Sequence, residues 1–382
     1  MEKEVINQRQ AILILSTFII GSSAVLGTGA QTKQDVWLTI IIAMAAASLV
    51  MAVYGRISKL FPGKNFYEIL DFLFGKVFGK IISSIFVFYA LHLGALILRD
   101  FAEFVRIVSL QETPGFIFAI SAVTITIFAV RSGIENLGRF IAIFFPILTF
   151  AIVAVTLLSA PLFNFNNLKP VLYNGIIPVL DASFHVFGFP FGETVLFLCL
   201  MGSIRKNSSA YKIYYISLLI GGIFLIIISV RSILVLGVPS TLIQNFASFA
   251  STRLIKVGSF FQRIEATVAI IFMISGFTKS TVCLYSATKG IAQILNIKDY
   301  RTLAGSLGIL MALSSMIIHK DAVELLEWTA KIYSYYAIPF QIIIPLIVWI
   351  TAEIKTRTSK KSKNEEETEE TNKEAIPSRN PV

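Results

Sequence analysis

Four of the ionisable residues that lie inside long apolar stretches of this sequence are candidates for chemistry. Glu193 follows a run of aromatic and small residues, Asp181 and His185 come shortly before it, and Lys279 stands in the run Gly-Phe-Thr-Lys-Ser-Thr. An ionisable side chain within a membrane is costly and is usually paired or functional. We therefore expect Glu193 to contact a ligand, a proton or a partner helix. The alternative is a structural hydrogen bond that ties its own helix together.

Asp181 and His185 are four residues apart and would share one face of a helix. Because histidine titrates near neutral pH, they form a candidate proton-sensitive pair. The alternative is a satisfied polar contact. The sequence contains no phosphate-binding glycine loop, nucleophile triad, HExxH or CxxC motif, so it does not predict an enzyme, a cofactor or a metal site.

One apolar segment, 176–203, is poorly suited to a continuous helix. Its centre, residues 186–193, reads Val-Phe-Gly-Phe-Pro-Phe-Gly-Glu. Pro190 lacks an N–H and its ring clashes with the preceding turn, while Gly188 and Gly192 give the backbone conformational freedom. We therefore expect the helix to break near its centre. Because unpaired backbone groups at membrane depth must line a cavity or meet protein, the break is a candidate binding site.

The first apolar segment contains a similar interruption. Gly21, Ser22 and Ser23, followed by Gly-Thr-Gly at residues 27–29, interrupt a run that is otherwise apolar. If the chain has ten spans, the interrupted segments are the first and the sixth, at corresponding positions of two five-span halves. Paired interruptions of this kind point to a transporter-type site at the bilayer midplane. The alternative is that these glycines only allow close helix packing.

The composition is that of an integral membrane protein. The 382-residue chain has 55% hydrophobic and 15% charged residues and a mean hydropathy of +0.76. Apolar stretches recur that are long enough to cross a bilayer. The expected spans are residues 10–29, 36–60, 77–98, 115–131, 139–159, 176–203, 211–237, 262–287, 302–318 and 333–352.

The basic residues predict the orientation of the chain. The net charge of +10 is carried mainly by short loops between apolar segments rather than by one face, so it does not indicate a nucleic-acid partner. By the positive-inside rule, both termini are expected in the cytoplasm. Cys199 and Cys283 fall inside expected spans and imply no disulfide framework. The polar tail 353–382 is expected to be disordered, with its basic part close to anionic lipid.

Several other polar or amphipathic stretches are less specific. Residues 66–73 are expected to form a short amphipathic helix at the membrane interface. Segment 238–261 is expected outside, either as short helices over the site or as a plain loop. Three tyrosines are either a gate or an interfacial aromatic belt: Tyr333, Tyr335 and Tyr336. Four charged residues have the spacing of a solvated helix end: Arg99, Asp100, Glu103 and Arg106.

Five short motifs point to one known family. The chain reads PGKNFYE from Pro62, GKVFGK from Gly75, IGSSAVL from Ile20, FGE from Phe191 and RIE from Arg263. Together they resemble the endospore germination permeases, the B subunits of spore nutrient-germinant receptors, which belong to the amino acid-polyamine-organocation superfamily. The resemblance covers most of residues 1–352. The chain departs from the family in its two serines after the first glycine, and it lacks the usual proline after the first helix.

The resemblance implies an all-α, LeuT-type fold of about ten transmembrane helices in a five-plus-five inverted repeat, with helices 1 and 6 broken. The repeats would cover about 10–159 and 176–352, and 353–382 would be a cytoplasmic tail. The resemblance also implies a place in the spore inner membrane with a larger A subunit and a lipoprotein C subunit. There the chain would recognise a small nutrient, such as an amino acid, and trigger germination. A proton-coupled amino acid permease with the same site is the alternative.

In this interpretation, helix N-termini bind the nutrient carboxylate and freed carbonyls bind its ammonium. Related carriers hold a sodium ion between helices 1 and 8, where the ammonium of Lys279 would replace it. Snorkelling of this lysine to the cytoplasmic interface is the alternative. The expected ligand-binding residues are Gly21, Ser22, Ser23, Phe187, Gly188, Phe189, Phe191, Gly192 and Glu193, and the candidate proton or cation residues are Lys279, His185 and Asp181.

Overall fold

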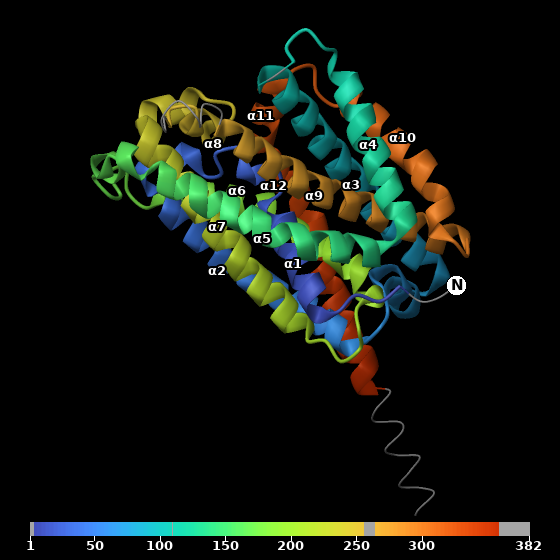
Figure 1. Ribbon diagram of the computed structural model, residues 1–382. Coiled ribbons are helices and arrows are strands. Elements are labelled where there is room, and N and C mark those ends of the chain that lie inside the picture. The colour runs from blue at the N-terminus through green and yellow to red at the C-terminus, as the bar shows by residue number, and fades with distance from the viewer. Residues whose placement is uncertain (1–3, 109, 256–263, 359–382) are drawn as a thin grey trace, which may run out of the picture.

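The computed structural model describes residues 4–108, 110–255 and 264–358 (Figure 1). This part of the chain consists of helices and turns without a β-strand. Nine of its helices are long and apolar enough to cross a membrane, and the shorter apolar helix Gln8–Ile20 precedes them. The expected all-α polytopic membrane fold is therefore confirmed.

The helices that build the membrane domain follow the expected spans closely. The last crossing contains α12 (Tyr333–Ile338) and η8 (Pro339–Ile343) and runs on to Thr358, past the expected boundary at 352. The remaining tail, 359–382, lies outside the described residues. The other helices are α1 (Gln8–Ile20), α2 (Val36–Leu60), α3 (Phe66–Val108), α4 (Gly115–Ser132), α5 (Ile134–Leu158), α6 (Ile177–Val186), α7 (Ala210–Ile243), α8 (Ala247–Thr252), α9 (Glu265–Leu295), α10 (Ala304–Ile317) and α11 (Ala322–Lys331).

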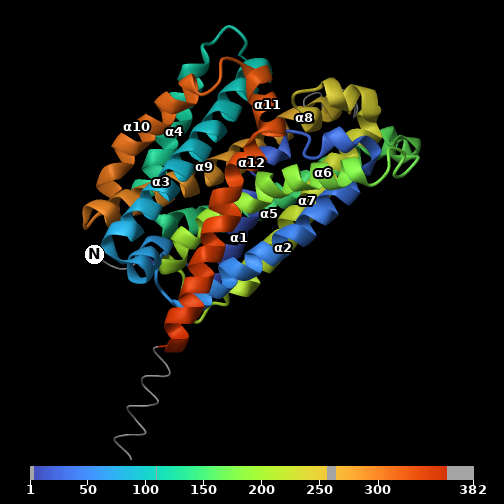
Figure 2. The ribbon, with the colours of Figure 1, turned by 180° about the vertical axis from the view of Figure 1, so that it is seen from behind.

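The long helices form two groups that meet along α1 and α9 (Figures 1 and 2). In one group α7 packs along α1 and α2, and α6 lies against α2. In the other group α3 packs along α9, and α10 lies against α3 and α4. α5 contacts both α1 and α9 and so joins the two groups.

Both expected helix breaks are present. α1 ends at Ile20, and Gly21 has φ +36° and ψ −137°, a conformation that favours glycine because a Cβ would be strained. After the single turn η1 (Ser22–Ala24) the chain continues in turns, and η2 (Ala30–Asp35) leads into the second crossing. In the sixth crossing, α6 is followed by the irregular segment η5 (Phe187–Phe191), in which Phe189 is extended (φ −134°, ψ 113°). The tighter 3-10 helix η6 (Gly192–Ser203) completes this crossing.

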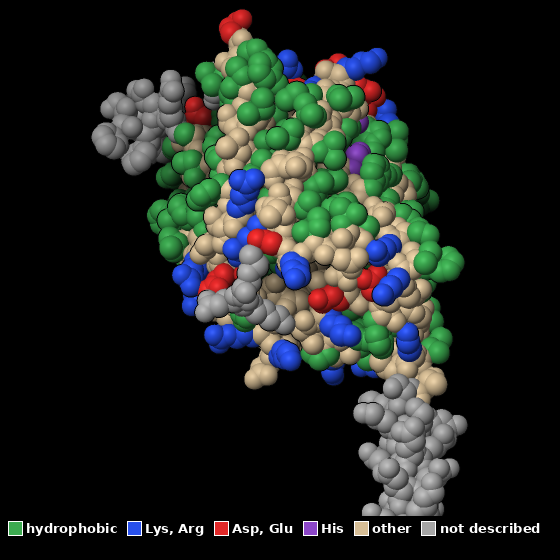
Figure 3. Space-filling model, turned by 90° about the vertical axis from the view of Figure 1, so that its right-hand side faces the viewer, with side chains coloured by type: hydrophobic (Ala, Val, Ile, Leu, Met, Phe, Trp, Pro, Cys, Tyr) green, Lys and Arg blue, Asp and Glu red, His purple; other side chains and the backbone are tan. Residues whose placement is uncertain are grey.

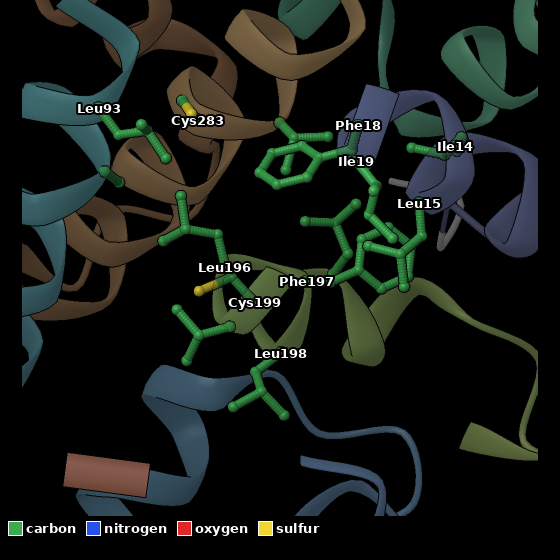
Figure 4. Packing of buried hydrophobic residues seen from close by; sticks show 14 of the residues in the cluster. Ile14, Leu15, Phe18, Ile19, Leu93, Leu196, Phe197, Leu198, Cys199 and Cys283 are labelled. Atoms are coloured by element: carbon green, nitrogen blue, oxygen red, sulfur yellow. The ribbon is translucent and has the colours of Figure 1, made fainter. Parts of the chain in front are cut away.

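One apolar core runs through both groups. Figure 4 shows Ile14, Phe18 and Ile19 of α1 close to Phe197 of η6, with other members of the same cluster around them. The two cysteines are buried and unbonded, as the sequence indicated. The core therefore includes residues of both broken crossings.

Charged side chains gather toward one end of the molecule. In Figure 3 apolar side chains cover the upper part, and Lys and Arg gather on the lower part. The N-terminal segment lies at this end, where Ile6 N–H donates to the carbonyl of Ser203 (2.9 Å) and Arg205 N–H donates to the carbonyl of Ile6 (3.1 Å). The last crossing ends at the same end, where Arg56 and Glu353 form an ion pair of 2.5 Å. Both ends of the described chain thus lie toward the basic end.

Two sequence expectations concern α3. The amphipathic stretch 66–73 is helical, as expected, and Gly75 (φ 75°) separates it from the long part of α3. Its apolar face is buried against protein. Phe66 packs on Phe86 with ring centroids 4.7 Å apart.

The helix also continues to Val108, so the charged cluster at its end is not a solvated helix end. Asp100 and Glu103 are buried, and Glu103 pairs with Arg99 (2.9 Å) and Arg106 (2.7 Å). Burial of an acid in this region requires such partners, because an isolated carboxylate would lose its hydration.

Segment 238–261 contains helical structure in its described part. α7 continues to Ile243 and is followed by α8, whose Phe249 contacts Phe104 of α3 (centroids 5.6 Å apart). Residues 256–263, which include Arg263 of the RIE motif, lie outside the described residues. The described part is therefore a packed helical segment rather than a plain loop.

Candidate functional site

The break in the first crossing lies against α9. Ser275 of α9 donates a hydrogen bond from Oγ to the carbonyl of Gly21 (2.9 Å). A Cβ at Gly21 would lie only 2.7 Å from Cδ of Lys279, so the glycine lets the lysine stem pass directly beside the break. α9 therefore supplies both a partner for a freed carbonyl and a cation next to it.

The break in the sixth crossing lies against the last crossing. Nε2 of Gln341 donates to the carbonyl of Gly188 (2.9 Å), a backbone group that the break has freed from the helix. A Cβ at Gly192 would lie 2.0 Å from Oε1 of Gln341, and one at Gly188 would lie 2.7 Å from Oγ of Ser334. These glycines therefore serve both interpretations of the sequence, since they accompany the break and also allow close helix packing.

A buried ion pair joins the sixth crossing to α9 beside these breaks. Nζ of Lys279 lies 2.5 Å from Oε2 of Glu193, and both side chains are 0% exposed. The hydroxyl of Tyr333 donates to Oε1 of the same carboxylate (2.5 Å). Lys279 therefore does not snorkel to the cytoplasmic interface. Glu193 makes a contact between helices rather than a hydrogen bond within its own helix.

The lysine ammonium has donors to spare. Among the described residues, Nζ makes no hydrogen bond of good geometry despite its short contact with Glu193. The rings of Phe189 and Phe18 lie 4.6 and 5.5 Å from Nζ and contribute cation–π attraction. An ammonium has three N–H donors. With one charged neighbour, it can still donate to another anionic or carbonyl oxygen.

A chain of hydrogen bonds continues from the ion pair. The hydroxyl of Tyr333 lies 3.2 Å from that of Tyr89 on α3, and Nε2 of Gln341 donates to the Tyr89 hydroxyl (2.9 Å). Separately, the hydroxyl of Tyr54 on α2 donates to the backbone carbonyl of Gln341 (2.5 Å). Gln341 therefore ties the last crossing to both α2 and α3, and the hydrogen bonds that continue from Glu193 run through the hydroxyls of Tyr333 and Tyr89.

A small cavity lies beside the ion pair. Its volume is about 20 Å³, and its lining includes Ser22, Asp100, Phe189 and Glu193. A space of this size holds about one water molecule. The site is therefore closed, and a nutrient needs a rearrangement of its walls.

A larger hollow of about 300 Å³ lies next to this cavity, away from the basic end. It is lined by residues 26–31, by His185 and by part of α11. Phe189 and Thr329 line both spaces. These two side chains are therefore the wall between the hollow and the ion pair.

The structure separates the expected site residues into distinct sets. Ser22, Phe189 and Glu193 line the small cavity beside the ion pair. The buried hydroxyls of Ser22 and Ser23 have no hydrogen-bond partner among the described residues. Phe187 and Phe191 are buried in the apolar core instead. Gly21, Gly188 and Gly192 act through the close approaches described above.

The expected pair of Asp181 and His185 does not form. Asp181 is exposed, and Nδ1 of His185 lies 3.2 Å from Oγ of Ser334 instead. Helical spacing places the two residues one turn apart. However, α12 packs closely against this part of the sixth crossing, and its Ser334 is the polar neighbour of the histidine. The structure therefore shows no mutual polar contact between these two side chains.

Sequence reasoning missed three contributors to the site. The spacing around Asp100 indicates a solvated helix end, and the patterns that mark the site point to neither Gln341 nor Thr329. Gln341 is a lone amide inside an otherwise apolar run, a signal that could have marked it. Thr329 comes from α11, a helix with no signal that tied it to the site.

Comparison with known proteins identifies the family. The model of the family described as spore germination protein matches residues 5–323. Spore germination protein KB of Bacillus subtilis (strain 168) is 30% identical over 370 residues, covering 96% of this chain and 99% of that protein. Spore germination protein YndE of the same strain is 24% identical over 347 residues, covering 89% of this chain and 95% of that protein.

Solved transporter structures share the fold. MhsT, in complex with L-phenylalanine, superposes with a TM-score of 0.62 at 12% identity, covering 92% of this chain and 100% of MhsT. MHP1 is a nucleobase-cation-symport-1 family transporter, solved in a closed conformation with bromovinylhydantoin bound. It superposes with a TM-score of 0.61 at 14% identity, covering 92% of this chain and 90% of MHP1. The LeuT-type fold is thereby confirmed. The chain belongs to the spore germination protein family, as its motifs indicated.

Proposed function

We propose that this chain is the nutrient-recognition subunit of a spore germinant receptor, and that it binds a small nutrient at the broken helices 1 and 6. The observation that carries the proposal is the buried pair of Glu193 and Lys279 beside both breaks. A buried ion pair is poor evidence for stability, since apolar residues would often serve as well. Its presence beside two interrupted crossings is better explained by ligand recognition.

An amino acid fits this arrangement best. Its carboxylate matches the unused donors of Lys279 and the hydroxyl of Ser22, and its ammonium matches the carboxylates of Glu193 and Asp100. Phe189 offers an apolar surface for the side chain of the nutrient. The remaining predicted residues of the two breaks would shape the pocket as it opens.

Binding would couple to a change of shape. Because the cavity holds about one water molecule, the nutrient binds a more open arrangement in which Phe189 and Thr329 have moved apart. The nutrient shifts the equilibrium only by its difference in affinity for the two arrangements.

We further propose the cellular setting that the family resemblance implies. The chain would lie in the spore inner membrane with both termini in the cytoplasm, beside a larger A subunit and a lipoprotein C subunit. The gathering of Lys and Arg at the end that carries both described chain ends supports this orientation. Residues 1–352 would act as one membrane domain, followed by the cytoplasmic tail.

A proton-coupled amino acid permease is the second candidate function. The hydrogen-bond chain from Glu193 through Tyr333 to Tyr89 favours it, because such a chain can relay a proton. The two functions differ in transport. Accumulation of a labelled amino acid driven by a pH gradient, in vesicles that contain this chain alone, would support the permease.

The proposed function is tested by a germination screen over single amino acids, sugars and nucleosides. We expect one nutrient class to trigger germination in the parent strain, and Glu193→Gln to lose that response. Glu135→Gln is the matched control, because Glu135 pairs with Arg139 (2.6 Å) on the exposed surface of α5. A full response of the Glu193→Gln strain at unchanged nutrient concentration, with normal protein levels, would refute the proposal.

A further inference from the structure

Another cavity lies among α3, α4, α5 and α9, apart from the breaks. Its volume is about 280 Å³. Phe140 and Phe277 form part of its wall, with ring centroids 5.4 Å apart. All four helices belong to candidate membrane spans, and the residues of α4 and α9 that line the cavity come from the central parts of those spans. The cavity therefore lies at membrane depth.

One end of this cavity is buried and the other reaches the outer surface of the helices. Ile97 and Leu98 at the buried end are 2% and 1% exposed, whereas Ile125 and Met273 are 58% and 40% exposed. The surrounding surface of α4 carries further exposed apolar side chains, such as Phe128 at 71%. The opening is thus continuous with a surface that faces hydrocarbon in a bilayer.

The chemistry of the lining favours an apolar occupant. Its hydroxyls belong to Thr126 and Ser280, which lie 3.0 Å apart. Each hydroxyl also lies within hydrogen-bond distance of a carbonyl of its own helix, at Ala122 (2.9 Å) for Thr126 and at Phe277 (3.0 Å) for Ser280. Because each hydroxyl carries a single proton, both protons are used within this set of groups. The rest of the lining is apolar, and apolar cavities stay dry.

Gly276 on α9 shows that the space is not used for helix packing. A glycine inside a membrane helix usually allows another helix to approach closely. A Cβ at Gly276 would meet only Cε2 of Phe272, at 3.7 Å, whereas one at Gly94 of α3 would lie 2.2 Å from Sδ of Met311. Gly276 therefore widens the cavity instead of admitting a neighbour.

We propose that this cavity binds an acyl chain of a membrane lipid. The chain enters between Ile125 and Met273 and ends against Ile97 and Leu98. An empty space at this depth would forfeit dispersion contacts that hydrocarbon from the bilayer supplies. Ile97 also lines the small cavity beside Glu193, so a bound acyl chain packs against the back of that wall.

The proposal is tested by photolabelling of the full chain in its native assembly. Membranes from cells grown with a fatty acid that ends in a diazirine are irradiated, and labelled residues are identified by mass spectrometry. We expect label on Ile97 or Leu98, which are buried and reached through the cavity. The label should fall roughly ten-fold in Gly276→Leu, whose side chain fills the cavity, and less in Gly276→Ala.

Gly115→Leu is the matched control, since a Cβ at Gly115 would meet only Cβ of Ala102, at 3.8 Å, and Gly115 does not line the cavity. Its label should equal that of the unmodified protein. Thermal unfolding verifies that each variant is folded. If Gly276→Leu does not fold, the labelling of Gly276→Ala relative to the unmodified protein decides the outcome. Equal labelling of all forms would overturn the proposal. So would label that appears only after the chain is purified away from its assembly, because a partner helix would then fill the cavity.

Discussion

Replacing one or both members of the Glu193–Lys279 pair should affect stability and nutrient response in different ways. The two charges are 2.5 Å apart and fully buried, so their attraction at an effective dielectric constant of about 20 is about 7 kcal/mol. The loss of hydration on burial offsets most of this attraction. The pair should therefore contribute little net stability, although either charge alone would be strongly destabilising.

The expected pattern follows from this balance. Glu193→Gln and Lys279→Met each leave one buried charge without its partner and should cost about 3–5 kcal/mol. The double variant removes both charges and should recover most of that stability, while the nutrient response stays lost. In Lys279→Met the carboxylate keeps the Tyr333 hydroxyl, which should make this variant the milder of the two single changes.

The assay combines thermal unfolding of the purified full chain in lipid nanodiscs with germination of the same strains. Glu135→Gln is the control, because its exposed partner Arg139 should make the unfolding temperature nearly insensitive to the change. Additive losses in the double variant would refute the reasoning, since they would mean that the two charges do not interact. A double variant that is stable and still responds to nutrient would show that recognition lies elsewhere.

Four further predictions follow from single contacts. Tyr333→Phe removes a hydrogen bond to the carboxylate and should lower the free energy of unfolding by about 1.5–3 kcal/mol, measured as above. Gly192→Ala should displace the side chain of Gln341 and reduce the unfolding temperature, and a second change, Gln341→Ala, should restore it; no restoration would contradict the packing described here. Phe189→Ala joins the small cavity to the outer hollow and should broaden the response to bulkier amino acids in the germination screen; an unchanged profile would argue against its position in the wall. Burial lowers the pKa of His319, in the loop after α10, so the unfolded chain binds a proton more readily than the folded chain. The contribution of the neutral histidine is therefore complete above about pH 6.5 and is lost as the pH falls through the folded pKa. The unfolding temperature should decline on acidification less steeply in His319→Gln, and equal slopes would contradict this.

Much of the fold could be predicted from the sequence because membrane helices are long and apolar. Backbone hydrogen bonding in lipid leaves few alternatives, so spans, their number and the two breaks at Gly21 and at 186–193 followed from local composition. Arg263 of the RIE motif and the tail 359–382 lie outside the described residues.

A local sequence pattern is insufficient where it fits two different surroundings. The stretch 66–73 is equally amphipathic whether it packs on lipid or on protein, and only the tertiary arrangement decides.

The site could be predicted only in part, because its contacts come from distant segments. Glu193 and Lys279 were each identifiable as costly charges within spans, but nothing local indicated that they pair over 86 residues of sequence (279 minus 193). The same limit explains the error on His185, whose partner comes from α12 rather than from its own helix. Spacing within a helix identifies neighbours on that helix, whereas it says nothing about the helix that packs against it.

The position of the ion pair gives the proposed receptor a means of converting binding into movement. Glu193 belongs to the sixth crossing, whose segment η6 contacts both helix groups, and Lys279 belongs to α9. A zwitterionic nutrient that enters between them replaces one short contact by two longer ones, since its ammonium faces the acid and its carboxylate faces the lysine. The charges stay balanced, so the exchange does not incur the penalty of an unpaired buried charge. The distance between the sixth crossing and α9 must nevertheless increase by the width of the nutrient. Tyr333 and Gln341, which contact the sixth crossing, would carry this displacement along the last crossing to the basic end.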